Sequence, residues 1–257
     1  MKRRHPRDIT LPIGLDYTHR QEGPTDIYFI SNQTSATITF SPQCRTKWEH
    51  RYLYDPMDGS ASTAPEKITL TPHGSVVLIA SDERDPAGLP VPQEESLNRK
   101  SHASSTTEVT GSWLMTFEEN GIRLTTDTLK GWETYDDPRI KYYSGHVRYE
   151  NTFKYKGKVK GKVWLQPDDV HDIATVYVNG ICCGTTWMAP HRIDITKAIK
   201  RGKNHLRIDV VNTWANALLG SDLGTPPFDG IWTNGKYRRA EKTPLPAGLG
   251  KGVYILR

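Results

Sequence analysis

The segment His146-Val147-Arg148-Tyr149-Glu150-Asn151-Thr152-Phe153-Lys154-Tyr155-Lys156 decides the fold. Val147, Tyr149, Phe153 and Tyr155 share one parity in this segment, and charged or polar side chains share the other. Successive side chains of a β-strand point to opposite faces of a sheet, so a period of two separates a buried face from a solvated one. The segment therefore predicts a half-buried antiparallel strand.

Alternation of the same kind continues toward the C-terminus. Val176 and Val178 lead into Asn179-Gly180, a dipeptide that favours a two-residue hairpin turn. Residues 193–195 and 206–210 alternate as well, and only residues 196–201 have the character of a helical turn. We therefore predict that residues 109–257 form a jelly-roll β-sandwich.

A second β-rich region lies toward the N-terminus. Its short runs of β-branched and aromatic residues, separated by turn residues, predict strands within residues 24–80. Residues 81–108 differ, because nine charged residues there accompany only five aliphatic ones. Such a stretch cannot bury enough apolar surface to fold alone. The sequence thus predicts an all-β protein, with a small antiparallel domain over residues 1–80, a linker over 81–108 and the jelly roll over 109–257.

Composition excludes several classes of protein. The formal net charge is +5, but no DNA- or RNA-binding signature accompanies it, so we expect no nucleic-acid partner. The longest purely apolar run is residues 76–80, which predicts no membrane partner. Three cysteines cannot build a disulfide framework, and residues 1–15 lack the apolar stretch of a signal peptide. These features do not specify the compartment in which the protein functions.

Candidate catalytic carboxylates occur as three adjacent pairs: Glu118-Glu119, Asp136-Asp137 and Asp168-Asp169. Hydrolysis of a glycosidic bond needs two carboxyl groups that face each other across a cleft. Neighbours on a strand point to opposite faces, so no pair forms a catalytic dyad by itself. We therefore predict no catalytic residue in this chain, although a dyad from distant positions stays open.

The densest cluster of metal-ligand types lies in residues 168–172, with Asp168, Asp169, His171 and Asp172. It matches neither an EF-hand nor zinc spacing. We expect a plain loop, with no cofactor and no metal site, and keep a calcium-stabilised turn as the alternative.

Tryptophans at predicted strand ends suggest sugar binding. Trp187, Trp214 and Trp232 lie among turn and polar residues, with His191 and Asn216 nearby in sequence. An indole ring offers an apolar face to the C–H side of a sugar, and His and Asn can hydrogen-bond its hydroxyls. We predict these five residues as a carbohydrate-binding set. The alternative is that Trp187 and Trp214 fill the ends of the sandwich as core residues.

The motifs that carry a family resemblance lie mainly in the second region: Val176-Tyr177-Val178-Asn179-Gly180, Gly184, Trp187, Pro190, Ile193-Asp194-Ile195-Thr196 and Gly202-Lys203-Asn204. They resemble the galactose-binding-like jelly roll, the sugar-binding-type domain of the β-galactosidase and β-glucuronidase family. This resemblance implies a galactose-binding-like β-sandwich over residues 109–257.

Further segments narrow the resemblance: Tyr142-Tyr143-Ser144-Gly145, Val210-Val211-Asn212-Thr213-Trp214-Ala215-Asn216-Ala217-Leu218-Leu219-Gly220 and Pro244-Leu245-Pro246-Ala247-Gly248-Leu249. With Tyr54-Asp55-Pro56 in the first region, they resemble the C-terminal part of bacterial α-L-rhamnosidases of glycoside hydrolase family 106. The resemblance covers most of residues 15–256. Two departures are Ala217, where the family more often has Arg, and the pair Cys182-Cys183.

That family's catalytic residues lie in a (β/α)8 barrel, which takes about 250 residues of alternating strands and helices. No such pattern occurs here. The resemblance implies a non-catalytic accessory portion of a rhamnosidase-like glycoside hydrolase, with a rhamnose-containing glycan and a separately encoded or missing barrel as partners. The alternatives are an autonomous carbohydrate-binding module and a small complete glycosidase.

Overall fold

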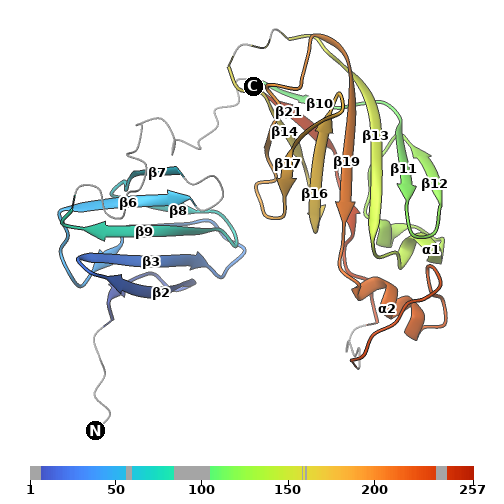
Figure 1. The fold of residues 1–257 in the computed structure, drawn as a ribbon. Helices are drawn as coiled ribbons and strands as arrows, with labels where there is room; N and C mark the ends of the chain where they lie inside the picture. The colour runs from blue at the N-terminus through green and yellow to red at the C-terminus, as the bar shows by residue number, and fades with distance from the viewer. Residues whose placement is uncertain (1–6, 56–59, 84–104, 158, 160, 236–241) are drawn as a thin grey trace. The chain divides into compact units, whose positions relative to one another are not determined.

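The structure is a computed structural model that describes residues 7–55, 60–83, 105–157, 159, 161–235 and 242–257. The chain divides into two compact units, Met1–Ser101 and His102–Arg257. Antiparallel strands dominate both units (Figure 1), so the prediction of an all-β fold is confirmed.

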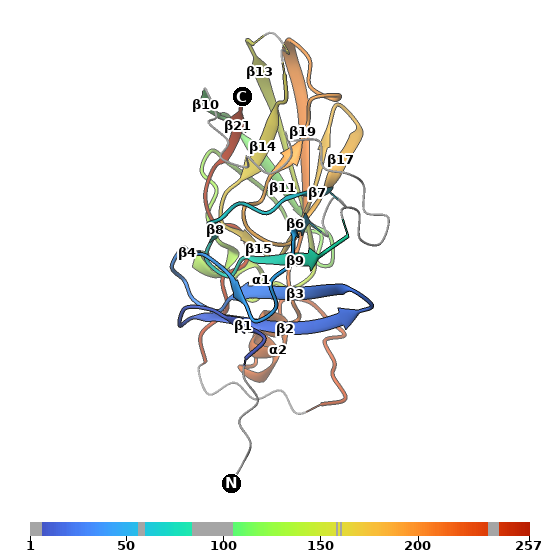
Figure 2. The ribbon, with the colours of Figure 1, turned by 90° about the vertical axis from the view of Figure 1, so that its left-hand side faces the viewer.

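The first unit is built on a five-stranded antiparallel sheet, in which β2 is one edge strand and pairs with β3 (Figure 2). In spatial order its strands are β2 (Leu15–Glu22), β3 (Thr25–Asn32), β9 (Ser75–Ser81), β6 (His50–Asp55) and β7 (Ser60–Thr63). Two short pairs accompany it: β1 (Ile9–Thr10) with β5 (Gln43–Cys44), and β4 (Ile38–Phe40) with β8 (Ile68–Leu70). Tyr28, Ile30 and Leu78 are buried in its core, because alternate side chains of β3 and β9 point inward.

The second unit contains a six-stranded and a four-stranded sheet. The six strands in order are β12 (Arg123–Thr126), β11 (Trp113–Phe117), β13 (His146–Tyr155), β19 (Gly202–Val211), β16 (Ile173–Val178) and β17 (Ile181–Thr186). The four are β10 (Thr106–Glu108), β21 (Val253–Leu256), β14 (Trp164–Pro167) and β18 (Ile193–Asp194). A short pair joins β15 (Val170–His171) to β20 (Gly248–Leu249).

The core of this unit contains the inward side chains of β13 and β19. Val147, Tyr149, Ile208 and Val210 have no exposed surface, as the alternation of the sequence predicts. The buried indole of Trp132 donates a hydrogen bond to the Tyr149 hydroxyl, with 2.5 Å between Nε1 and Oη. These two buried polar groups are therefore partners for each other inside the apolar core.

The structure corrects the C-terminal end of the predicted linker. Thr106–Glu108, assigned to the linker of residues 81–108, forms β10 and pairs with β21 from Tyr254 to Leu256. At the other end, Ser81 still belongs to β9. Residues 84–104 lie outside the described residues, so a linker there remains a proposal.

Helices are short, and the sequence analysis predicted none of the three that the described residues contain. The structure contains η2 (Trp132–Thr134), α1 (Pro138–Lys141) and α2 (Ala215–Asp222), whereas residues 196–201 contribute only a hydrogen-bonded turn. Helix α2 contains Asn, Gly, Ser and Asp, which are weak helix formers. Its buried residues Ala217 and Leu219 show that packing holds it. No helix in the described ranges is long and apolar enough to cross a membrane.

Limited proteolysis tests the proposed linker. We expect cleavage within residues 84–104, because charged, Pro- and Ser-rich stretches are preferred sites of nicking. Mass spectrometry should then show two resistant fragments that correspond to the two units. A single resistant fragment that retains residues 84–104 would contradict the linker.

A pair of glycine substitutions tests the packing of the Trp132 indole. Gly248 has φ +84°, and a Cβ there would collide with this ring, whereas Gly180 has φ +83° and no described heavy atom within 4 Å of such a Cβ. Gly180→Ala should cost about 1–2 kcal/mol from backbone strain alone. Gly248→Ala should cost about 2–5 kcal/mol, because overpacking adds to the strain. Urea unfolding, monitored by tryptophan fluorescence, measures the free energy of unfolding of both variants. Equal losses would contradict the overpacking, because they would show that the core around Trp132 relaxes to accept the added methyl group.

Candidate functional site

The structure places the three predicted tryptophans on the surface of the second unit. Trp187 follows the end of β17 and is 54% exposed, and Trp214 precedes α2 and is 53% exposed. Trp232 lies in the segment after α2 and is 77% exposed. A side chain that fills the end of a sandwich would be buried, so all three rings remain candidates for contact with a partner.

His191 lies in the loop that also carries Trp187. Its Nδ1 atom is 3.2 Å from the Thr186 hydroxyl, and the neighbouring Arg192 Nε donates to Gln166 Oε1 at 2.7 Å. Burial lowers the pKa of His191, nearby His171 lowers it further, and Asp168 partly opposes both. The loop is thus fastened to β17 and β14, and the imidazole has a preference for its neutral form.

Asn216 differs from the exposed position that the sequence analysis expects. It lies inside α2 and is 1% exposed. Its Nδ2 donates to the Leu245 carbonyl at 2.9 Å, and its Oδ1 accepts from the Leu245 N–H at 2.7 Å. The amide is therefore satisfied by the backbone of the C-terminal segment, and Asn216 leaves the candidate set.

The acidic pairs have structural partners. Tyr143, which is fully buried, donates its hydroxyl hydrogen to Glu119, and the His146 N–H lies 3.1 Å from both oxygens of that carboxylate. Asp137 caps α1 by accepting from the Arg139 N–H at 2.9 Å, and the Arg139 side chain lowers the pKa of Asp137. Asp169 pairs with His171 at 3.2 Å.

Within the described ranges, no group of three or more His, Cys, Asp and Glu side chains is arranged to hold a metal ion.

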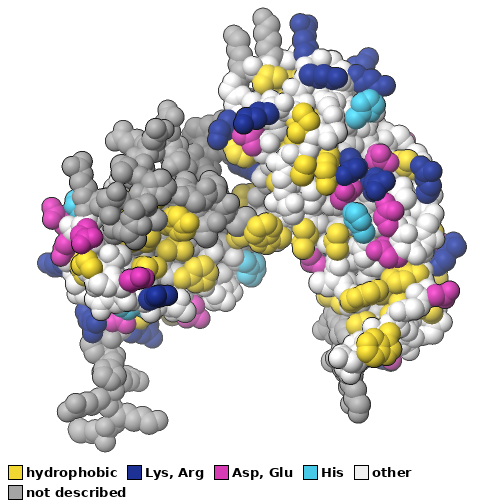
Figure 3. Space-filling view, viewed as in Figure 1, with side chains coloured by type: hydrophobic (Ala, Val, Ile, Leu, Met, Phe, Trp, Pro, Cys, Tyr) yellow, Lys and Arg dark blue, Asp and Glu magenta, His cyan; other side chains and the backbone are white. Residues whose placement is uncertain are grey.

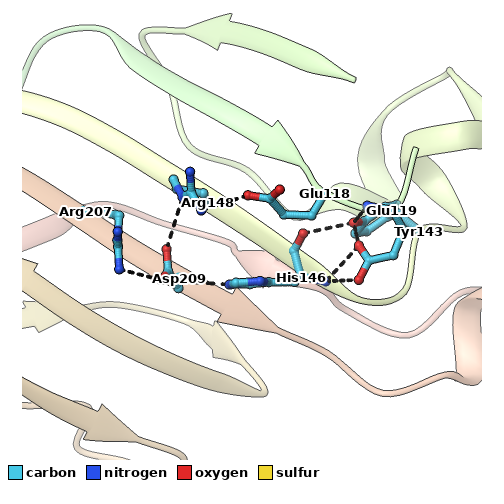
Figure 4. Close-up of polar contacts among 7 residues, drawn as sticks. All are labelled: Glu118, Glu119, Tyr143, His146, Arg148, Arg207 and Asp209. Carbon is cyan, nitrogen blue, oxygen red and sulfur yellow. Dashed lines mark hydrogen bonds and ion pairs between the residues drawn. The ribbon is translucent and has the colours of Figure 1, made fainter. Parts of the chain in front are cut away.

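A row of charged side chains lies on the face of the six-stranded sheet that points away from the core, here called the outer face (Figure 4). Asp209, with an 11% exposed side chain, lies between two arginines. Arg207 Nη2 is 3.2 Å from Asp209 Oδ2, and Arg148 Nε is 3.8 Å from Asp209 Oδ1. Arg148 also pairs with Glu118 at 3.1 Å, so charges alternate in sign along the row.

The sequence analysis missed this row as a possible site. The signal was present, because Arg148 belongs to the polar parity of β13, but that parity alone predicts only a solvated face. Figure 3 shows basic, acidic and histidine side chains gathered over β13 and β19. The row depends on the cross-strand partners Arg148 and Asp209, which are 61 positions apart in the sequence.

The lowered pKa of His191 makes a prediction about pH. The unfolded chain takes up a proton at His191 at a higher pH than the folded chain, so His191 contributes stability that is lost as the pH falls below about 6.5. His191→Gln should therefore reduce the loss of melting temperature between pH 7.5 and 5.5. Exposed His205→Gln is the control for the loss of an imidazole. Parallel pH profiles for wild type and His191→Gln would contradict the effect.

Comparisons with known proteins agree with this architecture. Residues 124–229 match the family model described as glycosyl hydrolase 2 galactose-binding domain-like. The chain resembles a solved rhamnosidase from Novosphingobium sp. PP1Y with 26% identity and a TM-score of 0.70, over 98% of this chain and 25% of the rhamnosidase. A Ruminococcus gnavus β-glucuronidase structure is 19% identical with a TM-score of 0.43, over 59% of this chain and 28% of that one.

A curated relative from Formosa agariphila, provisionally named a beta-glucuronidase, is 35% identical over 53% of this chain and 13% of its own length. This chain therefore spans only a small part of the proteins that it matches. The resemblance to a galactose-binding-like jelly roll and to a rhamnosidase is confirmed. Residues 124–229 thus resemble the glycosyl hydrolase 2 galactose-binding domain-like family, and the second unit has a galactose-binding-like fold of the kind associated with glycoside hydrolases.

Proposed function

We propose that this chain is a non-catalytic portion of a rhamnosidase-like glycosidase and acts beside a catalytic barrel that is encoded separately or missing. The match that carries this proposal joins 98% of the chain to 25% of a rhamnosidase. Both units take part in it, so the resemblance extends beyond the galactose-binding-like domain. Within the described ranges the helices are only one to two turns long, whereas a (β/α)8 barrel alternates strands with full helices.

Carbohydrate binding by the exposed aromatic residues is the finer part of this proposal. Trp187 and His191 share one loop, and hydrogen bonds of His191 and Arg192 fasten this loop to residues of β17 and β14. A rigid loop on a β-sandwich holds recognition groups without a large entropic cost on binding. The neutral imidazole can donate and accept hydrogen bonds with hydroxyls, and the indole supplies an apolar face. A rhamnose-containing glycan is the expected partner.

A second candidate role for the same surface is contact with the barrel. Exposed hydrophobic residues concentrate where β16 begins, β19 ends and α2 lies: Ile173, Trp187, Val211, Trp214, Leu223 and Leu245. Ile173 and Val211 are direct cross-strand partners. Contiguous exposed apolar surface marks an interaction site, and tryptophan is enriched among the residues that dominate protein interfaces. This apolar surface therefore fits a protein partner as well as a sugar.

Trp187→Ala distinguishes a ligand contact from a structural role. Because Trp187 is half exposed, its removal should shift the melting temperature little, whereas truncation of a buried aromatic costs about 3–5 kcal/mol. Affinity for rhamnose-containing glycans on an array should fall about tenfold, the effect of losing one stacking contact. Phe29→Ala, which removes an exposed aromatic from the first unit, is the matched control.

The same variants are then tested for association with the catalytic barrel of a rhamnosidase. If wild type binds no glycan but binds the barrel, and Trp187→Ala weakens that complex, the apolar surface is a docking site and the sugar-binding role is wrong. If wild type binds neither glycan nor barrel, the proposed function is wrong as a whole.

A further inference from the structure

A groove with a volume of about 750 Å³ crosses the outer face of the six-stranded sheet, beside the charged row. None of the five residues in the predicted carbohydrate-binding set lines it. The lining side chains used below are Leu114, Glu150, Thr152, Tyr177, His205 and Arg207. It is therefore a second candidate surface, separate from the exposed tryptophans.

The pairing register aligns the groove across the strands. Thr125 lies opposite Leu114, Leu114 opposite Glu150, Glu150 opposite Arg207, and Arg207 opposite Tyr177. These five residues come from five neighbouring strands, in spatial order β12, β11, β13, β19 and β16. All five residues line the groove. Four strand spacings of about 4.8 Å give a length of about 19 Å. A groove of this length fits a chain of several sugar rings better than a single ring.

Arg207 is held in place at the floor of the groove. Its guanidinium carbon lies 3.8 Å from the centre of the Tyr177 ring, and its Nη2 atom pairs with Asp209. Stacking and an ion pair together restrict the side chain, which is still 38% exposed. A fixed guanidinium presents hydrogen-bond donors to a ligand at little cost in side-chain entropy.

Glu150 supplies the opposite chemistry. Its side chain is exposed, and it forms no hydrogen bond or ion pair with any residue that the structure describes. One row along, the Thr152 hydroxyl lies 3.2 Å from His205 Nδ1. The groove thus combines a free acceptor, a fixed donor and a hydroxyl–imidazole pair, with apolar surface from Leu114 and Tyr177.

The charged row beside the groove contains buried polar atoms that make no hydrogen bond. The Nε atoms of Arg148 and Arg207 and the Oδ1 atom of Asp209 are buried without a hydrogen bond among the described residues, and Arg148 Nε and Asp209 Oδ1 form only a long ion pair at 3.8 Å. Each such group costs free energy relative to its solvated state. Local features that reduce stability occur preferentially at functional sites. The row therefore supports a binding role for the adjacent groove.

We propose that this groove binds a neutral oligosaccharide whose chain runs across the neighbouring strands β12, β11, β13, β19 and β16. The choice of a carbohydrate rests on the proposed function, whereas the place rests on the groove itself. The sugar hydroxyl groups can donate hydrogen bonds to Glu150 and accept them from Arg207. The free carboxylate of Glu150 would repel an anionic polymer. Apolar surface at Leu114 and Tyr177 complements the C–H faces of sugar rings.

The test uses the full chain and a glycan array that carries neutral oligosaccharides from one to six sugars. Affinity should rise with length up to the span of the groove, because each added ring reaches a further strand. Glu150→Gln keeps the side-chain shape and breaks no protein contact, yet it should weaken binding about tenfold by removing a charged acceptor. Asp127→Asn, at an exposed position of the same unit that does not line the groove, is the matched control and should bind as wild type.

A chemical readout locates the ligand independently. Cys182 is exposed and lies directly opposite Tyr177, a residue that lines the groove. The longest oligosaccharide that binds should slow alkylation of Cys182 by iodoacetamide, measured by peptide mass spectrometry. Protection should be lost in Glu150→Gln at the same ligand concentration.

The outcomes separate the two sugar-binding proposals. If Trp187→Ala abolishes binding while Glu150→Gln and Cys182 alkylation show no effect, sugars bind at the tryptophans and the groove proposal is wrong. If Glu150→Gln weakens binding and Trp187→Ala does not, the groove is the site. If no glycan on the array binds, both sugar-binding proposals are wrong, and binding to the barrel still tests the wider function.

Discussion

The continuous pairing of β13 with β19 links the core of the second unit to its outer face. Ten residues of each strand lie opposite one another, from His146 and Val211 to Tyr155 and Gly202. The inward parity supplies core residues such as Tyr149, and the outward parity supplies Arg148 and Asp209 of the charged row. A slip of one residue would exchange the two faces. The apolar core therefore fixes the register that assembles the charged row and the groove.

Sequence patterns predict those features that depend on neighbouring residues. The alternation in residues 146–156 predicts β13, and Asn179-Gly180 predicts the turn between β16 and β17, where both residues have positive φ. The groove depends instead on Leu114, Glu150, Arg207 and Tyr177, which become neighbours only through the strand order. No local signal specifies which strands pair, so the sequence alone does not reveal this site.

The errors have the same physical origin. Residues 106–108 are polar, which is typical of a linker, but β21 at the other end of the chain provides their pairing partner. Asn216 lies in a polar segment, yet the Leu245 backbone satisfies its amide and allows its burial. For Trp187 the sequence left two alternatives open, because an amphipathic indole suits both core and surface. Its exposure depends on tertiary packing. Predictions from local composition fail wherever a segment distant in the sequence supplies the hydrogen-bonding partner.

The second unit presents two surfaces of different chemistry that share no side chain. Exposed tryptophans and aliphatic residues dominate where β19 meets α2, whereas the groove combines charged, hydroxyl and aromatic groups farther along the same sheet. Occupation of one surface therefore requires no residue of the other. When two sites on one rigid scaffold engage the same substrate or assembly, the second contact forms at a high effective concentration. Two weak sites on one domain can thus hold a polymer that neither site alone would bind tightly.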